Sequence, residues 1–396
     1  MESNGMIRPI RVACVIKFTP VSYPRFLQSL ALFAMAFSLC PSLQSADNKA
    51  PDRQRRLYVT DKSGISVYDI DHGHQLLKKI DVPDSGDYKG IAASVQLGKL
   101  YVTSYKKDEL ICLDLKTDKV DWRKHLGAYA DSMQITPDGK RMYLPFRDED
   151  FWQVVDTATG NVVATIHTER GKNYDVHPIG NPVGPHNTWL NKHGTRAYLE
   201  VLTVPYVQIA DTSTNQIIGK VGPFAKGVRP FAVSEDEKLL YANVDGILGF
   251  SVGRVQQDGK WGGPALYTVE TTTPPERLRQ VNMPAHRPHS TPSHGINIRP
   301  DQKEVWIADS TFGYIYVFAL GSDRPKQIAS IPLFKDPKDQ PHPGWISFSI
   351  DGKYAYPDGG AVIDTATKEI AARIPTSEKL LEVDFSGSKP IEAGRR

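Results

Sequence analysis

Residues 132–145 read SMQITPDGKRMYLP, in which a short apolar strand, a polar turn and an aromatic-centred strand follow one another. The phrase returns as NTWLNKHGTRAYLE at 187–200, PFAVSEDEKLLYAN at 230–243, GINIRPDQKEVWIA at 295–308 and WISFSIDGKYAYPD at 345–358, with a looser copy, GIAASVQLGKLYVT, at 90–103. A turn of the Asp-Gly-Lys type between alternating apolar residues is a strong signal for a β-hairpin. The chain is therefore expected to repeat one antiparallel unit along most of its length.

A second phrase follows the first and completes the unit. It reads QVVDTATGNVVATI at 153–166, QIADTSTNQIIGKV at 208–221 and AVIDTATKEIAARI at 361–374. Asp and Thr side chains bond nearby backbone groups and so fix a turn between two further strands. Each unit thus holds four short antiparallel strands.

The number of units follows from the aromatic residue at the centre of each second strand. These anchors are Tyr58, Tyr101, Tyr143, Tyr198, Tyr241, Trp306 and Tyr356. Seven units of about 50 residues, with four strands each, predict an all-β, seven-bladed β-propeller. The first unit lacks an opening strand and residues 380–385 supply a spare one, so the N- and C-terminal strands are expected to pair and close the ring.

Two of these strands and the Asp-Thr turns carry a resemblance to a known family. Residues 57–60 read LYVT, residues 100–103 read LYVT again, and Asp-Thr-Ala-Thr begins at Asp156 and at Asp364. Over 57–387 the chain resembles the bacterial YVTN-repeat β-propellers, which include surface-layer and periplasmic proteins, and it is distantly similar to lactonase-like propellers, some of which are enzymes. Units five and six depart from the pattern, with FSVG at 250–253 and FALG at 318–321 in place of the Asp-Thr turn.

The first residues predict export. Basic residues, a charge-free apolar run at 26–40 and small residues after it are typical of a secretory signal peptide, which we assign to 1–46. We expect a linker at 47–56, the propeller at 57–387, a tail at 388–396, and a periplasmic or extracellular location without a membrane span after processing. An uncleaved anchor helix is the alternative. The leader holds four of the 48 Lys and Arg and one of the 45 Asp and Glu, so the remaining charge is balanced, and nucleic acid is not an expected partner.

Candidate site residues come from the start of each inner strand, twelve positions before each anchor. In a propeller these positions surround one mouth of the central channel, and loops on a rigid scaffold are where ligand-binding residues collect. His342 precedes the seventh blade's position by two residues, and Glu382 is the nearest acid of the closing strand. The residues at the six aligned positions are Lys89, Asp131, His186, Arg229, His294 and Gly344.

Three long loops between blades, at 170–185, 271–293 and 334–343, strengthen this prediction because long loops in compact domains are often functional. With the strand starts they bring six of the eleven histidines to one face: His177, His186, His286, His289, His294 and His342. His186, His294 and His342 could hold a divalent metal such as Zn, Cu or Mn, with a carboxylate from Asp131 or Glu382. Alternatively, these histidines only bond backbone carbonyls at the strand starts.

The function remains open among three classes. The leading hypothesis is an exported, monomeric protein that binds a small molecule or a protein at the mouth, with Lys89, Arg229 and Arg147 for an anion, Trp152 to stack a ring, and Glu382. The second is a metal-dependent or lactonase-like enzyme, either a hydrolase or lyase or a copper oxidoreductase, that uses His186, His294, His342 and Asp131. The third is a structural or protein-docking propeller. The only Cys outside the leader, Cys112, is expected to be buried as a small hydrophobe.

Overall fold

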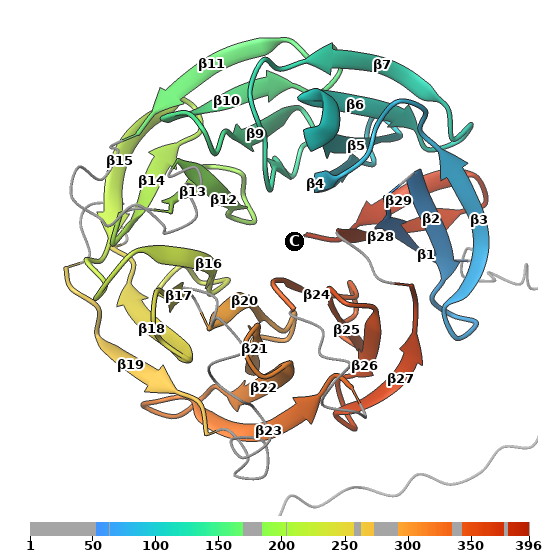
Figure 1. The fold of residues 1–396 in the computed structure, drawn as a ribbon. Coiled ribbons are helices and arrows are strands. Elements are labelled where there is room, and N and C mark those ends of the chain that lie inside the picture. The colour runs from blue at the N-terminus through green and yellow to red at the C-terminus, as the bar shows by residue number, and fades with distance from the viewer. Residues whose placement is uncertain are drawn as a thin grey trace, which may run out of the picture. The chain divides into compact units, whose positions relative to one another are not determined.

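In the computed structural model the described residues are 53–62, 64–168, 184–202, 204–256, 263–272, 292–334, 343–375 and 379–395. They form seven antiparallel sheets arranged around a common centre (Figure 1). Six sheets have four strands, and each is built from consecutive strands of the chain. The prediction of an all-β, seven-bladed propeller with four strands per blade is confirmed.

The strands are β1 (Arg53–Thr60), β2 (Gly64–Asp69), β3 (Gln75–Asp81), β4 (Tyr88–Ser94), β5 (Lys99–Ser104), β6 (Glu109–Asp114), β7 (Val120–His125), β8 (Gln134–Ile135), β9 (Arg141–Pro145), β10 (Phe151–Asp156), β11 (Val162–His167), β12 (Pro185–Leu190), β13 (Arg196–Val201), β14 (Val207–Asp211), β15 (Gln216–Val221), β16 (Val228–Val233), β17 (Leu239–Val244), β18 (Gly249–Arg254), β19 (Tyr267–Glu270), β20 (Ser293–Ile298), β21 (Glu304–Asp309), β22 (Tyr314–Ala319), β23 (Lys326–Pro332), β24 (Ile346–Phe348), β25 (Tyr354–Pro357), β26 (Ala361–Asp364), β27 (Glu369–Arg373), β28 (Leu380–Ser386) and β29 (Lys389–Ala393). One short 3-10 helix, η1 (Tyr105–Lys107), lies between β5 and β6. None of the described residues form a helix long and apolar enough to cross a membrane.

The ring closes through the terminal strands, as predicted. β28 pairs with β1 in antiparallel register from Arg53 with Ser386 to Val59 with Leu380. The predicted tail at 388–396 is wrong in one respect, because Lys389–Ala393 forms β29 on the other edge of β28 and makes the closing sheet five-stranded. The start of the propeller also moves from residue 57 to Arg53. An alternating segment as short as KPIEA gives too weak a signal to separate a strand from a tail.

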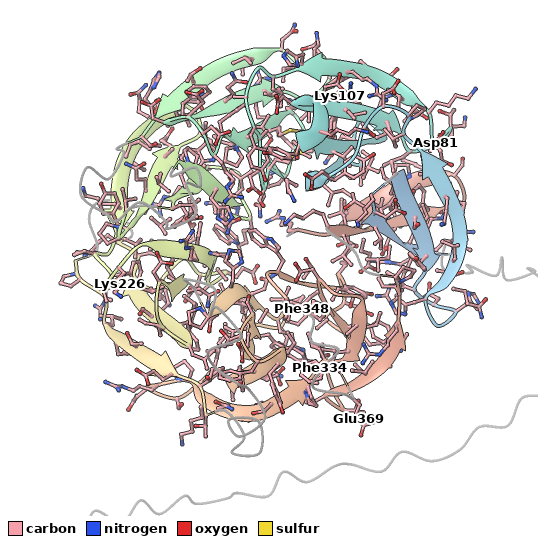
Figure 2. The ribbon with its side chains drawn as sticks, viewed as in Figure 1. Asp81, Lys107, Lys226, Phe334, Phe348 and Glu369 are labelled. Carbon is pink, nitrogen blue, oxygen red and sulfur yellow. The ribbon has the colours of Figure 1, made fainter. Side chains whose placement is uncertain are left out.

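The aromatic anchors lie between the blades, where they hold neighbouring sheets together. All seven are nearly or fully buried, and the cluster around Trp306 also includes Phe348, whose ring meets the indole edge-on at 5.6 Å. Figure 2 shows Asp81 and Glu369 at the outer rim and Phe348 further in. Cys112 is a free, buried thiol, as predicted, and burial raises its pKa to about 12. The hydrophobic core is thus distributed over the faces between blades.

Several anchors also bond the next blade through their polar atom. The Tyr198 hydroxyl donates to Glu237 Oε1 at 2.8 Å, whereas the buried Tyr58 hydroxyl has no hydrogen-bond partner among the described residues. A hydrogen bond to a charged group contributes about 1.5–3 kcal/mol. We therefore expect Tyr198→Phe to lower the free energy of unfolding by about 1–2 kcal/mol, as measured by urea denaturation. Tyr58→Phe is the matched control and should change it by less than about 0.5 kcal/mol; equal losses in the two variants would contradict this assignment.

Candidate ligand site at the channel mouth

The innermost strands of the blades begin at one end of the central channel. Figure 1 shows β4, β12, β16, β20 and β24 close to the centre, while β7, β11, β15 and β23 lie at the rim. An isolated parallel bridge joins Ser132 to Asn187, so the inner strands of two adjacent blades run in the same direction. Because they share a direction, their first residues meet at the same mouth of the channel.

Four inner strands carry an irregularity at the predicted site positions. In β4 and β12 the pairing with the second strand skips one residue, which is Lys89 in β4 and His186 in β12. The register shifts in the same way across Arg229 in β16 and across His294 in β20. Such β-bulges re-aim a side chain away from the regular sheet and are common beside functional sites. The repeated bulge therefore sets the direction of these four side chains.

The centre of the mouth is a buried pair formed by His186 and Glu200. His186 Nδ1 lies 2.9 Å from Glu200 Oε2, and His186 Nε2 lies 3.9 Å from Asp131 Oδ2. Glu200 is fully buried on β13, and its Oε1 has no hydrogen-bond partner among the described residues. An unsatisfied buried oxygen costs free energy, so it needs a donor from water or from a ligand.

Burial decides the protonation of this pair. Burial lowers the pKa of His186 well below its ordinary 6.5, and the nearby charges of Arg147 and His294 lower it further. Burial also raises the pKa of Glu200 well above its ordinary 4.5, although the Arg229 charge opposes this rise. Burial therefore favours the uncharged form of both groups. With both groups uncharged, Glu200 donates to His186 Nδ1 and the imidazole proton is on Nε2, so this form of His186 presents an N–H donor to the mouth.

Two Arg–Asp pairs flank the histidine. Arg147 Nη1 lies 3.4 Å from Asp131 Oδ2, and the buried Arg147 Nε has no hydrogen-bond partner among the described residues. Arg229 binds both oxygens of Asp245, at 2.7 and 3.3 Å. Arg147 thus keeps an unused donor beside His186, whereas the Arg229 guanidinium is engaged by a bidentate carboxylate.

A cluster from the sixth and seventh blades lies against His186. The Trp345 ring is centred 5.4 Å from the His186 ring and 5.7 Å from the His294 ring, and the two imidazoles are 5.8 Å apart. His294 Nδ1 donates to the Gly344 carbonyl at 2.8 Å, and the Lys379 ammonium lies 4.0 Å over the Trp345 ring. Blade β12–β15 and blade β24–β27 are separated by two others, so Trp345 spans the mouth.

The structure brings together most, but not all, of the predicted residues. Asp131, Arg147, His186 and His294 form one contact network with Glu200, Trp345 and Lys379. Arg229, paired with Asp245, lies close enough for its charge to act on His186 and Glu200. Lys89 is at its expected strand start but is paired with Asp87 at 2.9 Å. His342, His177, His286 and His289 lie outside the described residues.

Two predicted ligand contacts have other roles. Trp152 is fully buried, and its Nε1 donates to Thr188 Oγ1 at 2.9 Å, so its ring has no exposed face on which a ligand could stack. Glu382 accepts from Arg55 Nε at 3.0 Å and from the Ile350 amide at 2.7 Å. Ile350 belongs to the turn that follows β24, at the opposite end of that strand from the mouth. Because β29 extends the closing sheet beyond β28, Glu382 lies inside the sheet rather than at its channel edge.

Sequence reasoning missed Glu200, although the repeat contains a signal for it. Glu200 is two residues after the anchor Tyr198, and the same position holds Asp358 after Tyr356. Asp358 Oδ1 accepts the backbone amides of Gly344 and Trp345, at 2.7 and 2.8 Å. In both blades this acid supports the start of the inner strand, so comparing the second position after each anchor finds it.

The metal hypothesis has no support among the described residues, in which no group of three His, Cys, Asp or Glu side chains is spaced to hold an ion. His342, which the hypothesis needs, is not described. His186 Nδ1 is bonded to Glu200 and His294 Nδ1 to the Gly344 carbonyl, so a metal at these two histidines would have to be held by their Nε2 atoms, with a third ligand from elsewhere. The metal site stays a prediction.

The fold and the site together define a β-propeller with a polar, histidine-containing channel mouth. No protein-family model and no curated protein matches the chain, so the YVTN repeat remains a resemblance of sequence. Solved structures do match. A protein from Lactobacillus plantarum is 12% identical, with a TM-score of 0.65 over 86% of this chain and 100% of that one.

Two other solved structures are similar to the chain. The β-propeller domain of Cps50 (Swd1) from Myceliophteria thermophila is 12% identical, with a TM-score of 0.56 over 77% of this chain and 88% of that one. Hydrazine synthase from Kuenenia stuttgartiensis is 17% identical, with a TM-score of 0.53 over 71% of this chain and 77% of that one. At these identities the three structures establish the propeller fold alone.

Proposed function

We propose that this protein is exported and binds a small polar ligand at the mouth formed by His186, Glu200, Arg147 and Asp131. The signal-peptide pattern at 1–46 supports a periplasmic or extracellular location. The observation that carries the binding proposal is the buried Arg147 Nε, which has no hydrogen-bond partner among the described residues and lies beside the buried His186–Glu200 pair. Buried polar clusters that are only partly satisfied are costly, and proteins retain them mainly where they meet a ligand or water.

The donors of the mouth indicate the chemistry of the ligand. The uncharged form of His186 offers an N–H at Nε2, and Arg147 offers an N–H at Nε that none of the described residues accepts. Both are donors, and Arg147 carries a charge, so the complementary group is a hydrogen-bond acceptor with negative charge, such as a carboxylate or phosphate. The β-bulges at Lys89, His186, Arg229 and His294 support a site that was shaped for recognition.

The enzyme alternative rests on one observation, which is that Glu200 fixes the orientation of His186. A carboxyl group at Nδ1 is the usual partner of a histidine that acts as general base at Nε2. That role requires a free lone pair on Nε2, whereas the neutral pair with a protonated Glu200 carries a proton there. The lone pair appears only after the pair loses a proton, which burial of both groups disfavours, so the uncharged pair supports binding over base catalysis.

Thermal unfolding in the presence of small ligands tests the binding proposal. Probes of three kinds are suitable: mono- to tricarboxylates, inorganic phosphate and neutral sugars. A ligand present at 100 times its dissociation constant stabilises the folded state by about 2.7 kcal/mol, which corresponds to a rise in Tm of about 5 °C for a domain of this size. We expect at least one anionic probe to give such a rise and neutral sugars to give none.

Two variants connect that result to the mouth. Arg147→Gln and His186→Asn should each remove most of the rise, while Lys140→Gln, an exposed lysine in the β8–β9 turn, should leave it unchanged. If every probe left the wild-type Tm unchanged, or if the two mouth variants responded like the control, the binding proposal would fail. A purely structural or docking propeller predicts that outcome.

Removal of metal separates the binding proposal from the metal-dependent enzyme. Under the binding proposal, dialysis against EDTA leaves the Tm of the purified protein, and its response to the anionic probe, unchanged within about 1 °C. Element analysis of untagged protein provides the direct measurement. Stoichiometric Zn, Cu or Mn that is lost in His294→Ala would instead establish the metal site.

A further inference from the structure

The end of the channel opposite the histidine mouth holds a cavity of about 260 Å³. Its walls come from β4 and β8, from the turns that follow these strands, and from β28 and β29. These turns lie at the far ends of the inner strands from Lys89 and Asp131, so the cavity is separate from the mouth. Figure 1 shows the C-terminal end of the chain, which follows β29, at the centre of the ring, and Ile391, Glu392 and Ala393 of β29 line the cavity together with residues of β4.

The wall of the cavity is mixed, with polar groups beside a group of apolar side chains. Ile91, Met133, Ile135, Leu381 and Ile391 line the cavity, and Ile391 is 40% exposed at a β-bulge in β29. A closed apolar cavity of about 150 Å³ accepts benzene, so this larger space accommodates on the order of ten non-hydrogen atoms. Apolar side chains together with polar groups that converge on one space are features of a small-molecule site.

Most polar side chains of the wall are already bonded within the protein. Gln96 donates to the Pro137 carbonyl, Gln134 accepts from the Leu190 amide, and Glu392 pairs with Arg53 at 2.7 Å. Arg395 differs, because its only hydrogen bond among the described residues is a long one, 3.5 Å from Nη2 to the Lys192 carbonyl.

Arg395 therefore offers donors that the described part of the chain leaves unused. No carboxylate of the described residues lies within ion-pair distance of its guanidinium, and Glu235, a nearby acid, is bonded to Lys192. A guanidinium has five N–H donors and matches the two oxygens of a carboxylate. A cation with spare donors beside apolar side chains is complementary to an organic anion.

We propose that this cavity is a second ligand site, which takes a small organic carboxylate with an apolar body of about ten non-hydrogen atoms. The carboxylate pairs with Arg395, and the apolar body packs against Ile91, Met133 and Ile391. The site does not depend on the mouth, and its occupancy requires no change at His186.

Isothermal titration of the full chain with benzoate tests this site. Benzyl alcohol, which has the same ring without the charge, should bind at least ten-fold more weakly. Arg395→Gln should weaken benzoate at least ten-fold, with the exposed Arg254→Gln as control. Ile391→Trp should abolish binding, because the indole occupies the cavity. Ile328→Trp is its control, since Ile328 is 52% exposed at the corresponding bulge of an outer strand, β23.

Three outcomes would overturn the proposal. These are no heat of benzoate binding at 20 mM with the wild-type protein, equal affinity in Arg395→Gln and Arg254→Gln, and loss of affinity in His186→Asn but not in Arg395→Gln. The third outcome would assign benzoate to the mouth and would support the proposed function while excluding the second site. Circular dichroism of each variant confirms that the fold is retained.

Discussion

Replacing Trp152 with alanine is expected to lower the free energy of unfolding by about 3–5 kcal/mol, the range found when a fully buried aromatic side chain is truncated in a core. Trp152 packs in the cluster that joins its blade to the next one, and its indole N–H bonds Thr188. Urea denaturation gives the loss directly. Trp152→Phe keeps most of the buried area and should cost roughly half as much.

The Trp152 variants, together with one at Thr188, also separate packing between the blades from stacking on a ligand. Thr188→Val removes the hydrogen-bond acceptor alone, and we expect a loss of about 1 kcal/mol. The anionic probe that stabilises the wild-type protein should still stabilise Trp152→Phe. A loss below about 1 kcal/mol in Trp152→Ala, together with loss of the probe's effect, would show that Trp152 contacts the ligand after all.

Raising the pH from 5 to 8 is expected to remove about 2 kcal/mol of stability through Glu382. Burial, together with the neighbouring Asp384 charge, raises the pKa of Glu382 from 4.5 to about 7, while Arg55 and the Ile350 amide oppose the rise. The folded state therefore holds this proton more tightly than the unfolded state. The stabilisation is complete below about pH 4.5 and is lost as the pH rises through about 7.

Urea denaturation at pH 5 and at pH 8 measures this effect, and Glu382→Gln is the variant that isolates it. Glutamine keeps the size of the side chain and does not titrate, so its stability should change by about 2 kcal/mol less than that of the wild-type protein between the two pH values. Glu392→Gln, a partly exposed acid on the same sheet, serves as the control. A wild-type protein that gains stability over this interval, with no difference in Glu382→Gln, would contradict the account of the closing sheet.

The fold could be predicted from sequence because the same physical constraint recurs in every blade. Each blade needs a turn, an aromatic residue at its contact with the next blade and an alternating outer strand, so the hairpin phrase and its anchor repeat. The pairing of β1 with β28 could be predicted because the first repeat unit lacks its opening strand and the C-terminal end of the chain has a spare one. The additional strand β29 has no counterpart in the repeat, and its five residues carry too weak an alternation to be recognised.

The candidate site could be predicted only where it follows the repeat. Counting twelve residues back from each anchor located His186, Arg229 and His294, because a bulge occurs at the same place in each of these blades. This count could not show that the Trp152 side chain is buried or that Glu382 lies within a five-stranded sheet. Both features depend on how strands and blades pack against one another. Position along a strand was therefore predictable, and the surroundings of each side chain were not.

The most direct test of binding at the mouth is the imidazole ¹⁵N spectrum of histidine-labelled protein at pH 7, recorded with and without the most stabilising anionic probe. His186→Asn and His294→Asn assign the two signals. The account predicts a neutral His186 with its proton on Nε2, and a change of the His186 Nε2 signal that saturates with the probe. A protonated His186 in the free protein, or signals of both mouth histidines that do not move while the probe still raises the Tm, would contradict it.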